Sequence, residues 1–179
     1  MSHLARTLAS TLAALAVVGA LVGCAPSPEL TPTPTGFASE EEAFAAAEAT
    51  YRAYVDALNA VDLSDPETFE PVFALTTGDL NSTDRESYSA LHADAMSIDG
   101  DARVAWVERL ESGNEPDEIV LAVCLDVRDV TLYDSTGTPV VNPDRPDVQE
   151  LRVEAVLQHA LSAYLIRDVA GLEGSRCMD

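Results

Sequence analysis

The sequence contains no lysine, and its ten basic residues are all arginines. Against 31 aspartate and glutamate residues, they leave a formal net charge of −21 at pH 7. Binding to the phosphates of a nucleic acid requires clustered lysine and arginine side chains that release counterions. The arginines of this chain are instead scattered along the sequence. We therefore expect no nucleic acid partner.

No apolar run is long enough to cross a bilayer as a helix, which takes about 20 residues. The longest run, Leu8–Val22, follows a single fixed positive charge at Arg6. Its length is that of the apolar region of a signal peptide. A buried core helix is the alternative, but such a helix has a polar face, and this run is apolar on all sides. The run therefore predicts export from the cytosol.

The apolar run ends in Leu21-Val22-Gly23-Cys24, which resembles the lipobox of bacterial lipoproteins. The resemblance implies that residues 1–23 are a lipoprotein signal peptide, removed before Cys24, and that the Cys24 thiol carries a diacylglyceryl group. Two acyl chains give durable attachment, which places the domain on the outer face of the cell membrane. Because the lack of lysine is typical of a GC-rich genome, we expect an actinobacterial host.

Besides Cys24 the chain has only two cysteines, Cys124 and Cys177. An exported protein meets an oxidising environment, where an even number of cysteines can pair. A disulfide between these two would contribute about 4 kcal/mol by closing the loop between them. Two buried thiols are the alternative. The spacing excludes a CxxC redox motif, so the prediction is a structural disulfide that ties the C-terminal tail to a central strand.

Prolines at positions 26, 28, 32 and 34 exclude a helix directly after Cys24 and favour extended polyproline II. Residues 24–38 are therefore predicted to be a lipidated linker, rich in proline and threonine, between the membrane and the domain. The remaining residues, 39–179, suffice for one hydrophobic core. We expect them to form a single globular domain.

Helical patterns fill the first half of this domain. Ser39 followed by Glu42 is a capping box, and an apolar stripe recurs at three- and four-residue intervals through Val61. A short helix from Glu67 to Leu75 and a third helix from about Ser82 to Ala95 are predicted to follow. The stripe of the first helix consists of Phe44, Ala47, Tyr51, Val55 and Leu58.

Strand patterns fill the second half. Alternation is weak over Arg103–Leu110 and strong over Glu118–Tyr133, and Leu151–His159 and Leu161–Val169 are predicted as a final pair. Helices followed by antiparallel strands indicate an α+β fold, with the helices packed on a bent antiparallel sheet. The residues predicted to share the inward face of the strongest strand are Ile119, Leu121, Val123, Leu125 and Val127. Turns are predicted at 111–116, 134–139 and 142–146.

This order of elements ends in Ala163-Tyr-Leu-Ile-Arg-Asp-Val, followed by Gly-Ser-Arg-Cys177. It resembles the nuclear transport factor 2-like superfamily, over residues 39–177. The resemblance implies a cone-like fold, in which an N-terminal helix and two shorter helices pack into the concavity of the sheet. It brings no catalytic signature with it.

Four side chains would line the cavity of such a cone: Tyr51, Tyr54, Asp94 and Trp106. A tyrosine beside an aspartate there would suit general acid–base chemistry on a small ketone or phenol. Tyrosines packed in the core are the alternative. An enclosed cavity with a buried carboxylate beside a tyrosine hydroxyl would favour an enzyme, whereas a cavity filled by Phe44, Tyr51 and Trp106 would argue against one.

Patterns of metal binding and catalysis are scarce. Apart from His3 in the signal peptide, the histidines are His92 and His159, and neither accompanies a serine or cysteine nucleophile motif. The segment from Asp79 begins like a calcium loop. It has aspartate at position six and alanine at position twelve, where glycine and glutamate are needed. We therefore predict no metal and no cofactor, and assign no catalytic residue.

The leading hypothesis is a non-enzymatic module of the cell envelope, held at the membrane by its lipid, that binds a small ligand or an envelope protein. One alternative is an enzyme of the dehydratase or isomerase kind that uses the sheet cavity. Another is a structural envelope component. A large exposed apolar patch would favour a protein partner.

Overall fold

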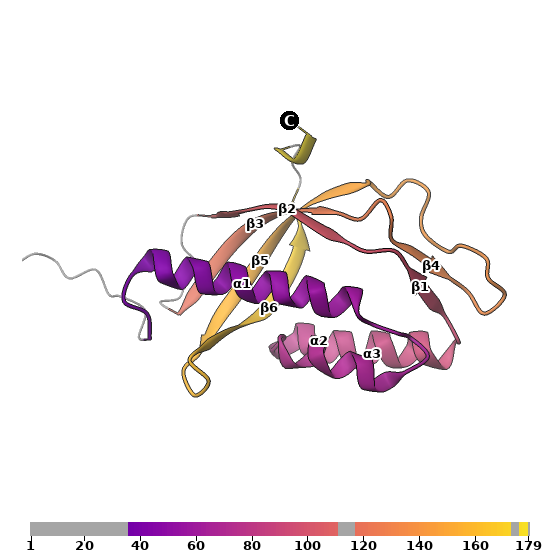
Figure 1. The fold of residues 1–179 in the computed structure, drawn as a ribbon, viewed down its shortest axis with the longest axis horizontal. Coiled ribbons are helices and arrows are strands. Elements are labelled where there is room, and N and C mark those ends of the chain that lie inside the picture. The colour runs from indigo at the N-terminus through magenta and orange to yellow at the C-terminus, as the bar shows by residue number, and fades with distance from the viewer. Residues whose placement is uncertain (1–35, 111–116, 173–175, 179) are drawn as a thin grey trace, which may run out of the picture. The chain divides into compact units, whose positions relative to one another are not determined.

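The structure is a computed structural model that describes residues 36–110, 117–172 and 176–178 (Figure 1). The predicted signal peptide, Cys24, nearly all of the predicted linker and the predicted turn at 111–116 lie outside these residues. The helices are α1 (Glu40–Asn59), α2 (Glu70–Ala74) and α3 (Gly78–Ala93), with short 3-10 helices η1 (Pro66–Phe69) and η2 (Arg176–Met178). The strands are β1 (Ser97–Asp99), β2 (Arg103–Arg109), β3 (Glu118–Asp126), β4 (Thr131–Tyr133), β5 (Val148–Gln158) and β6 (Ala163–Gly171).

Helix α1 begins where the capping box predicts. Ser39 is the N-cap, and its Oγ accepts a hydrogen bond from the Glu42 N–H at 3.1 Å. The Glu42 carboxylate accepts from the Ala38 N–H at 2.7 Å, one residue before the position that a capping box uses. Every residue of the predicted apolar stripe lies in the core or packs against it. The helix ends at Asn59, shortly before the predicted end at Val61.

The predicted helix from Glu67 to Leu75 is a 3-10 turn, η1, that continues into α2. Pro71 has no N–H to donate to a preceding carbonyl, so one continuous helix cannot form across this segment. The predicted inward side chains, Phe69, Val72 and Phe73, are nonetheless buried in the core. The position of the segment was therefore predicted correctly, and its helix type was not.

Helix α3 begins at Gly78, one turn before the predicted start at Ser82. The segment before it runs along the edge of β6: the Thr77 N–H donates to the Ile166 carbonyl, and the Ile166 N–H donates to the Leu75 carbonyl, both at 2.9 Å. These bonds end α2 and let α3 start directly afterwards. Ala95 lies outside the helix, with φ at +52°.

The strands form two antiparallel sheets, a four-stranded sheet in the order β2-β3-β5-β6 and a pair of β1 with β4. The predicted strand Glu118–Tyr133 is in fact two strands, β3 and β4. The chain turns between them, with a hydrogen bond of 3.1 Å from the Val130 N–H to the Val127 carbonyl. The predicted inward face of this segment lies in the core, and β5 and β6 form the predicted final pair.

Helix α1 lies across one face of the four-stranded sheet, and α2 and α3 lie beside each other near the C-terminal end of α1 (Figure 1). This inner face holds the hydrophobic core, with Tyr51, Leu121, Tyr164 and Ile166 among its largest fully buried side chains. The predicted α+β fold, with helices packed on antiparallel strands, is confirmed. None of the helices in the described ranges is both long enough and apolar enough to span a membrane.

Candidate functional site

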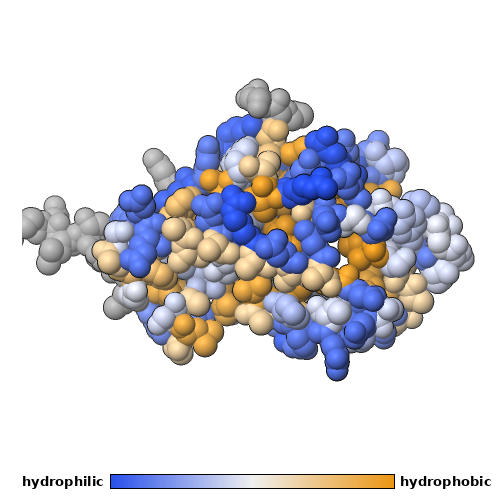
Figure 2. All heavy atoms as spheres, viewed as in Figure 1, coloured by the Kyte–Doolittle hydropathy of each residue, from blue (hydrophilic) through white to orange (hydrophobic). Residues whose placement is uncertain are grey.

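A pocket of about 410 Å³ lies between the end of α1, helix α3, strand β1 and the end of β3. We call it the mouth pocket. Figure 2 shows hydrophobic atoms exposed between the C-terminal end of α1 and the β1–β4 pair. The lining residues are Leu58, Asn59, Val61, Tyr88, Ile98, Asp99, Gly100, Asp101, Ala102, Leu125, Val127 and Val130.

Two local contacts fix the wall of the mouth pocket. The Asn59 side chain donates to the Ala102 carbonyl and accepts from the Ala102 N–H, both at 2.9 Å, so the end of α1 is bound to the segment before β2. Gly100 has φ at +82°, and a Cβ there would lie 1.9 Å from the Asp129 carbonyl oxygen. The close approach of the two chain segments therefore requires glycine at this position.

The walls of the mouth pocket are mostly apolar, and its charged residues are all acidic. Leu125 and Val127 continue the inward face of β3, and Ile98 is 40% exposed although it is a large aliphatic residue. Asp99 and Asp101 are exposed and lie at the rim. No arginine or histidine is among the lining residues. The pocket thus offers an apolar surface with carboxylates at its entrance.

One helical turn before Tyr88 lies a carboxylate with one buried oxygen that has no hydrogen-bond partner among the described residues. Oδ2 of Asp84 is buried, and no donor among the described residues reaches it. Burial raises the pKa of Asp84 to about 6. Burial, and next the charge of Asp84, raises the pKa of Tyr88 to about 12 and that of Tyr54 further above its usual value. The three side chains therefore form a cluster of one carboxylate and two phenols between α1 and α3.

The four predicted cavity residues do not line the mouth pocket. Tyr51 and Tyr54 are buried in the core, 6.1 Å apart between ring centroids. Asp94 is exposed at the C-cap of α3. Trp106 pairs with a residue of the outer face of the sheet and lies under the guanidinium of Arg176, 5.4 Å from its carbon to the ring centroid. Asp94 and Trp106 are therefore corrected from cavity residues to a helix end and the outer face.

Asp84 and Tyr88 were missed by the sequence analysis, although a signal for them exists. They stand four residues apart inside the predicted third helix, so they share one face of it. Tyr88 also stacks on Phe69 at 5.1 Å between ring centroids, which restricts the orientation of its ring. A carboxylate on the apolar face of an amphipathic helix is the pattern that points to such a residue.

A second pocket, of about 280 Å³, lies between η1, α2 and α3. Its Arg85 guanidinium lies over the Phe73 ring at 4.1 Å and donates from Nε to the Asn81 side chain at 3.1 Å. His92 lies at its edge, with Nδ1 2.7 Å from the Leu63 carbonyl. That carbonyl can only accept, so Nδ1 carries a proton and His92 joins α3 to the segment between α1 and η1. These contacts give His92 a structural role.

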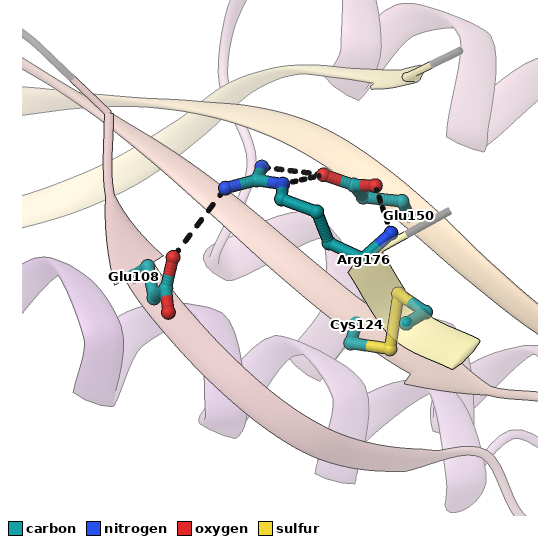
Figure 3. Close-up of a disulfide and its surroundings, with 5 residues drawn as sticks. Glu108, Cys124, Glu150 and Arg176 are labelled. Atoms are coloured by element: carbon teal, nitrogen blue, oxygen red, sulfur yellow. Dashed lines mark hydrogen bonds and ion pairs between the residues drawn. A yellow bond between two sulfur atoms is a disulfide. The ribbon is translucent and has the colours of Figure 1, made fainter. Parts of the chain in front are cut away.

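The predicted disulfide joins Cys124 of β3 to Cys177, with 5.6 Å between the Cα atoms (Figure 3). This confirms the predicted pairing. Next to it, Arg176 donates from Nε to Glu150 at 2.6 Å, and the Glu150 side chain is only 3% exposed. The disulfide therefore holds the C-terminal segment, and one arginine in particular, over the outer face of the sheet.

No protein-family model matches the chain, and no curated protein matches it. The intermembrane space region of the chloroplast protein ARC6 is similar at 11% identity and a TM-score of 0.48, over 72% of this chain and 95% of that one. CagV, a VirB8 homologue of the type IV secretion system of Helicobacter pylori, is similar at 8% identity and a TM-score of 0.46, over 73% of this chain and 99% of that one. A protein of Novosphingobium aromaticivorans assigned as an aromatic ring hydroxylase is similar at 13% identity and a TM-score of 0.44, over 74% of this chain and 94% of that one.

These likenesses assign no family. All three TM-scores lie below 0.5 and all three identities below 25%. The resemblance to the nuclear transport factor 2-like superfamily stays a prediction from the order of elements. Within the described ranges, no three histidine, cysteine, aspartate or glutamate side chains are grouped as metal ligands.

Proposed function

We propose that this chain is an extracytoplasmic lipoprotein, anchored through Cys24, whose domain binds a small ligand with an apolar body in the mouth pocket. The observation that carries the binding role is the pocket itself. Its volume of about 410 Å³ lies in the range of small-molecule sites, about 300 to 1,000 Å³. Such sites combine apolar walls with a few polar groups, as this pocket does.

The site suits binding because the pocket is built from fixed elements. The paired hydrogen bonds between Asn59 and Ala102 and the glycine at position 100 hold its shape without a ligand. A ligand that enters it covers apolar side chains that otherwise face water, which contributes about 25 cal/mol per Å² of apolar surface. A preformed pocket also avoids the cost of ordering a loop on binding.

The anchoring part of the proposal has separate support. The sequence places Cys24 directly after an apolar run of signal-peptide length. The disulfide between Cys124 and Cys177 fits a compartment in which disulfides persist. Acidic domains are repelled by anionic headgroups, so we expect the domain to be tethered to the membrane surface rather than adsorbed on it.

Binding is tested with N-phenyl-1-naphthylamine, a neutral probe whose fluorescence rises in apolar surroundings. Val130→Phe places a phenyl ring in the wall of the mouth pocket and should weaken binding of the probe at least about fivefold. Val140→Phe makes the same change at an exposed valine that does not line the pocket, and should leave binding unchanged. Equal fluorescence titrations for the two variants, or no fluorescence rise with the wild type, would overturn the binding role.

A second candidate function is proton transfer, favoured by the buried oxygen of Asp84. A carboxyl with a pKa of about 6 can take and release a proton near neutral pH, and Tyr88 keeps its phenolic proton there. This arrangement would suit proton abstraction next to a carbonyl. In D₂O, an enzyme of this kind should exchange the α-protons of cyclohexanone faster than buffer alone, and Asp84→Asn should abolish the excess. Exchange at the buffer rate would reject this candidate.

A further inference from the structure

We propose that the ligand of the mouth pocket is a cationic amphiphile: an apolar chain or ring that carries one ammonium group. This inference rests on the proposed binding function and names its ligand class. The ammonium would lie at the rim beside Asp99 and Asp101, in contact with the Tyr88 ring, while the apolar part would lie against the aliphatic wall.

The two carboxylates at the rim are available to a cation. Neither the Asp99 nor the Asp101 side chain forms a hydrogen bond or an ion pair with any described residue, and both residues are exposed. They stand on either side of Gly100, whose close contact with Asp129 fixes the turn. Two unpaired negative charges on one fixed turn attract a monovalent cation more strongly than either charge alone.

The arginines of the neighbouring segments do not neutralise this rim. Arg103 pairs with Asp129 at 2.7 Å, and Arg128 pairs with Asp126 at 2.9 Å. Arg145 donates to the carbonyls of the turn after β3, both at 2.8 Å, and is not among the lining residues of the pocket. The guanidinium groups of Arg103 and Arg128 are held by carboxylates that do not line the pocket, and that of Arg145 is held by two backbone carbonyls. An anionic ligand therefore meets carboxylates at the rim and no cation among the lining residues.

An aromatic ring adds a second attraction for the same charge. The face of a tyrosine ring attracts an ammonium group within about 6 Å of its centroid. Tyr88 lines the pocket, and Asp84 lies one helical turn before it with a buried oxygen that has no donor. The formal net charge of −21 further raises the local concentration of cations around the domain.

The experiment compares three ligands with the same eight-carbon chain: octyltrimethylammonium, 1-octanol and octyl sulfate. Each is titrated below its micelle concentration against N-phenyl-1-naphthylamine bound to the full domain. Octyltrimethylammonium should displace the probe at a concentration about tenfold lower than 1-octanol, and octyl sulfate should be the weakest. The Asp99→Asn/Asp101→Asn variant should lose most of the preference for the cation and keep its affinity for 1-octanol.

The control variant is Glu86→Gln/Asp168→Asn, which removes the same charge from two exposed residues that do not line the pocket. It should keep the preference for the cation, because the inference depends on charges at the rim. Equal displacement by the three ligands, or equal loss of preference in both variants, would overturn the cationic ligand and leave the binding pocket standing. If the probe does not bind at all, the proposed function itself fails.

Discussion

Replacing Asp84 by asparagine should stabilise the domain at neutral pH, because the fold partly buries a negatively charged carboxylate there. Its Oδ2 is buried without a donor, and burial raises its pKa from the usual 3.8 to about 6. At pH 7 the folded protein therefore keeps a charge that water would solvate better in the unfolded chain. Asparagine has nearly the same shape and carries no charge, so it removes this cost.

The size of the effect follows from the pKa. A rise from 3.8 to about 6, at about 1.4 kcal/mol per pH unit, corresponds to roughly 3 kcal/mol as an upper limit. Asp84 is only partly buried, so solvent screening reduces this to about 1 to 1.5 kcal/mol. The asparagine amide still has one group without a hydrogen-bond partner, which offsets part of the gain in stability. The expected net stabilisation at pH 7.5 is about 1 kcal/mol, or about 3 °C in Tm.

The pH dependence identifies the charge as the cause. A carboxyl whose pKa is higher in the folded than in the unfolded state binds protons preferentially in the folded state. The cost of Asp84 is therefore complete above pH 6, and it disappears as the pH falls from about 6 to about 4. The advantage of Asp84→Asn over the wild type should be complete at pH 7.5 and fall to about a third of that value at pH 4.5.

The assay is guanidinium unfolding of the oxidised domain, followed by circular dichroism at both pH values. Asp79→Asn is the matched control on the same helix. Asp79 is exposed in the first turn of α3, where a negative charge favours the helix dipole, so its loss should cost about 0.5 kcal/mol. A less stable Asp84→Asn variant at pH 7.5, or an advantage that is the same at pH 4.5, would refute the reasoning.

Three further predictions concern the anchor and the outer face. Cys24→Ala should lose incorporation of radiolabelled palmitate and move from the membrane fraction to the soluble one; equal label in both proteins would reject the anchor. Cys177→Ser should lower the free energy of unfolding by about 4 kcal/mol, because the disulfide closes a loop of 53 residues; unchanged guanidinium unfolding would contradict this. Arg176→Ala should lower the free energy of unfolding by about 1 to 2 kcal/mol, since it leaves the buried Glu150 carboxylate without its cation. Glu108→Gln, which breaks only the exposed pair with Arg176, should change stability by less than about 0.5 kcal/mol, and equal losses in the two variants would contradict the role of burial.

Local patterns in the sequence were sufficient to predict the order of elements. The capping box at Ser39 and the inward face of β3 depend on neighbouring residues alone, and both lie where they were predicted. The disulfide also followed from a count of cysteines and the expected compartment. The division of the predicted strand Glu118–Tyr133 into β3 and β4 could not be predicted in this way. It depends on a turn at Val127–Val130 and on pairing of β4 with the distant β1.

The mouth pocket could not be predicted for the same reason. Its walls come from the ends of elements, such as Leu58 of α1 and Val127 after β3, which meet only through long-range packing. The sequence favoured Asp94 as the carboxylate beside the tyrosines, but that residue caps α3 and faces solvent. Asp84, inside the same helix, has the buried carboxylate oxygen instead.

The most direct test of the central claim is an NMR titration of the domain, labelled with ¹⁵N, with octyltrimethylammonium. We expect the largest amide shifts at Asn59, Tyr88, Gly100 and Val130, which lie around the mouth pocket, and a single binding curve shared by all four. Shifts scattered over the acidic surface without saturation, or centred on Phe73 and Arg85 in the second pocket, would contradict ligand binding at the mouth pocket.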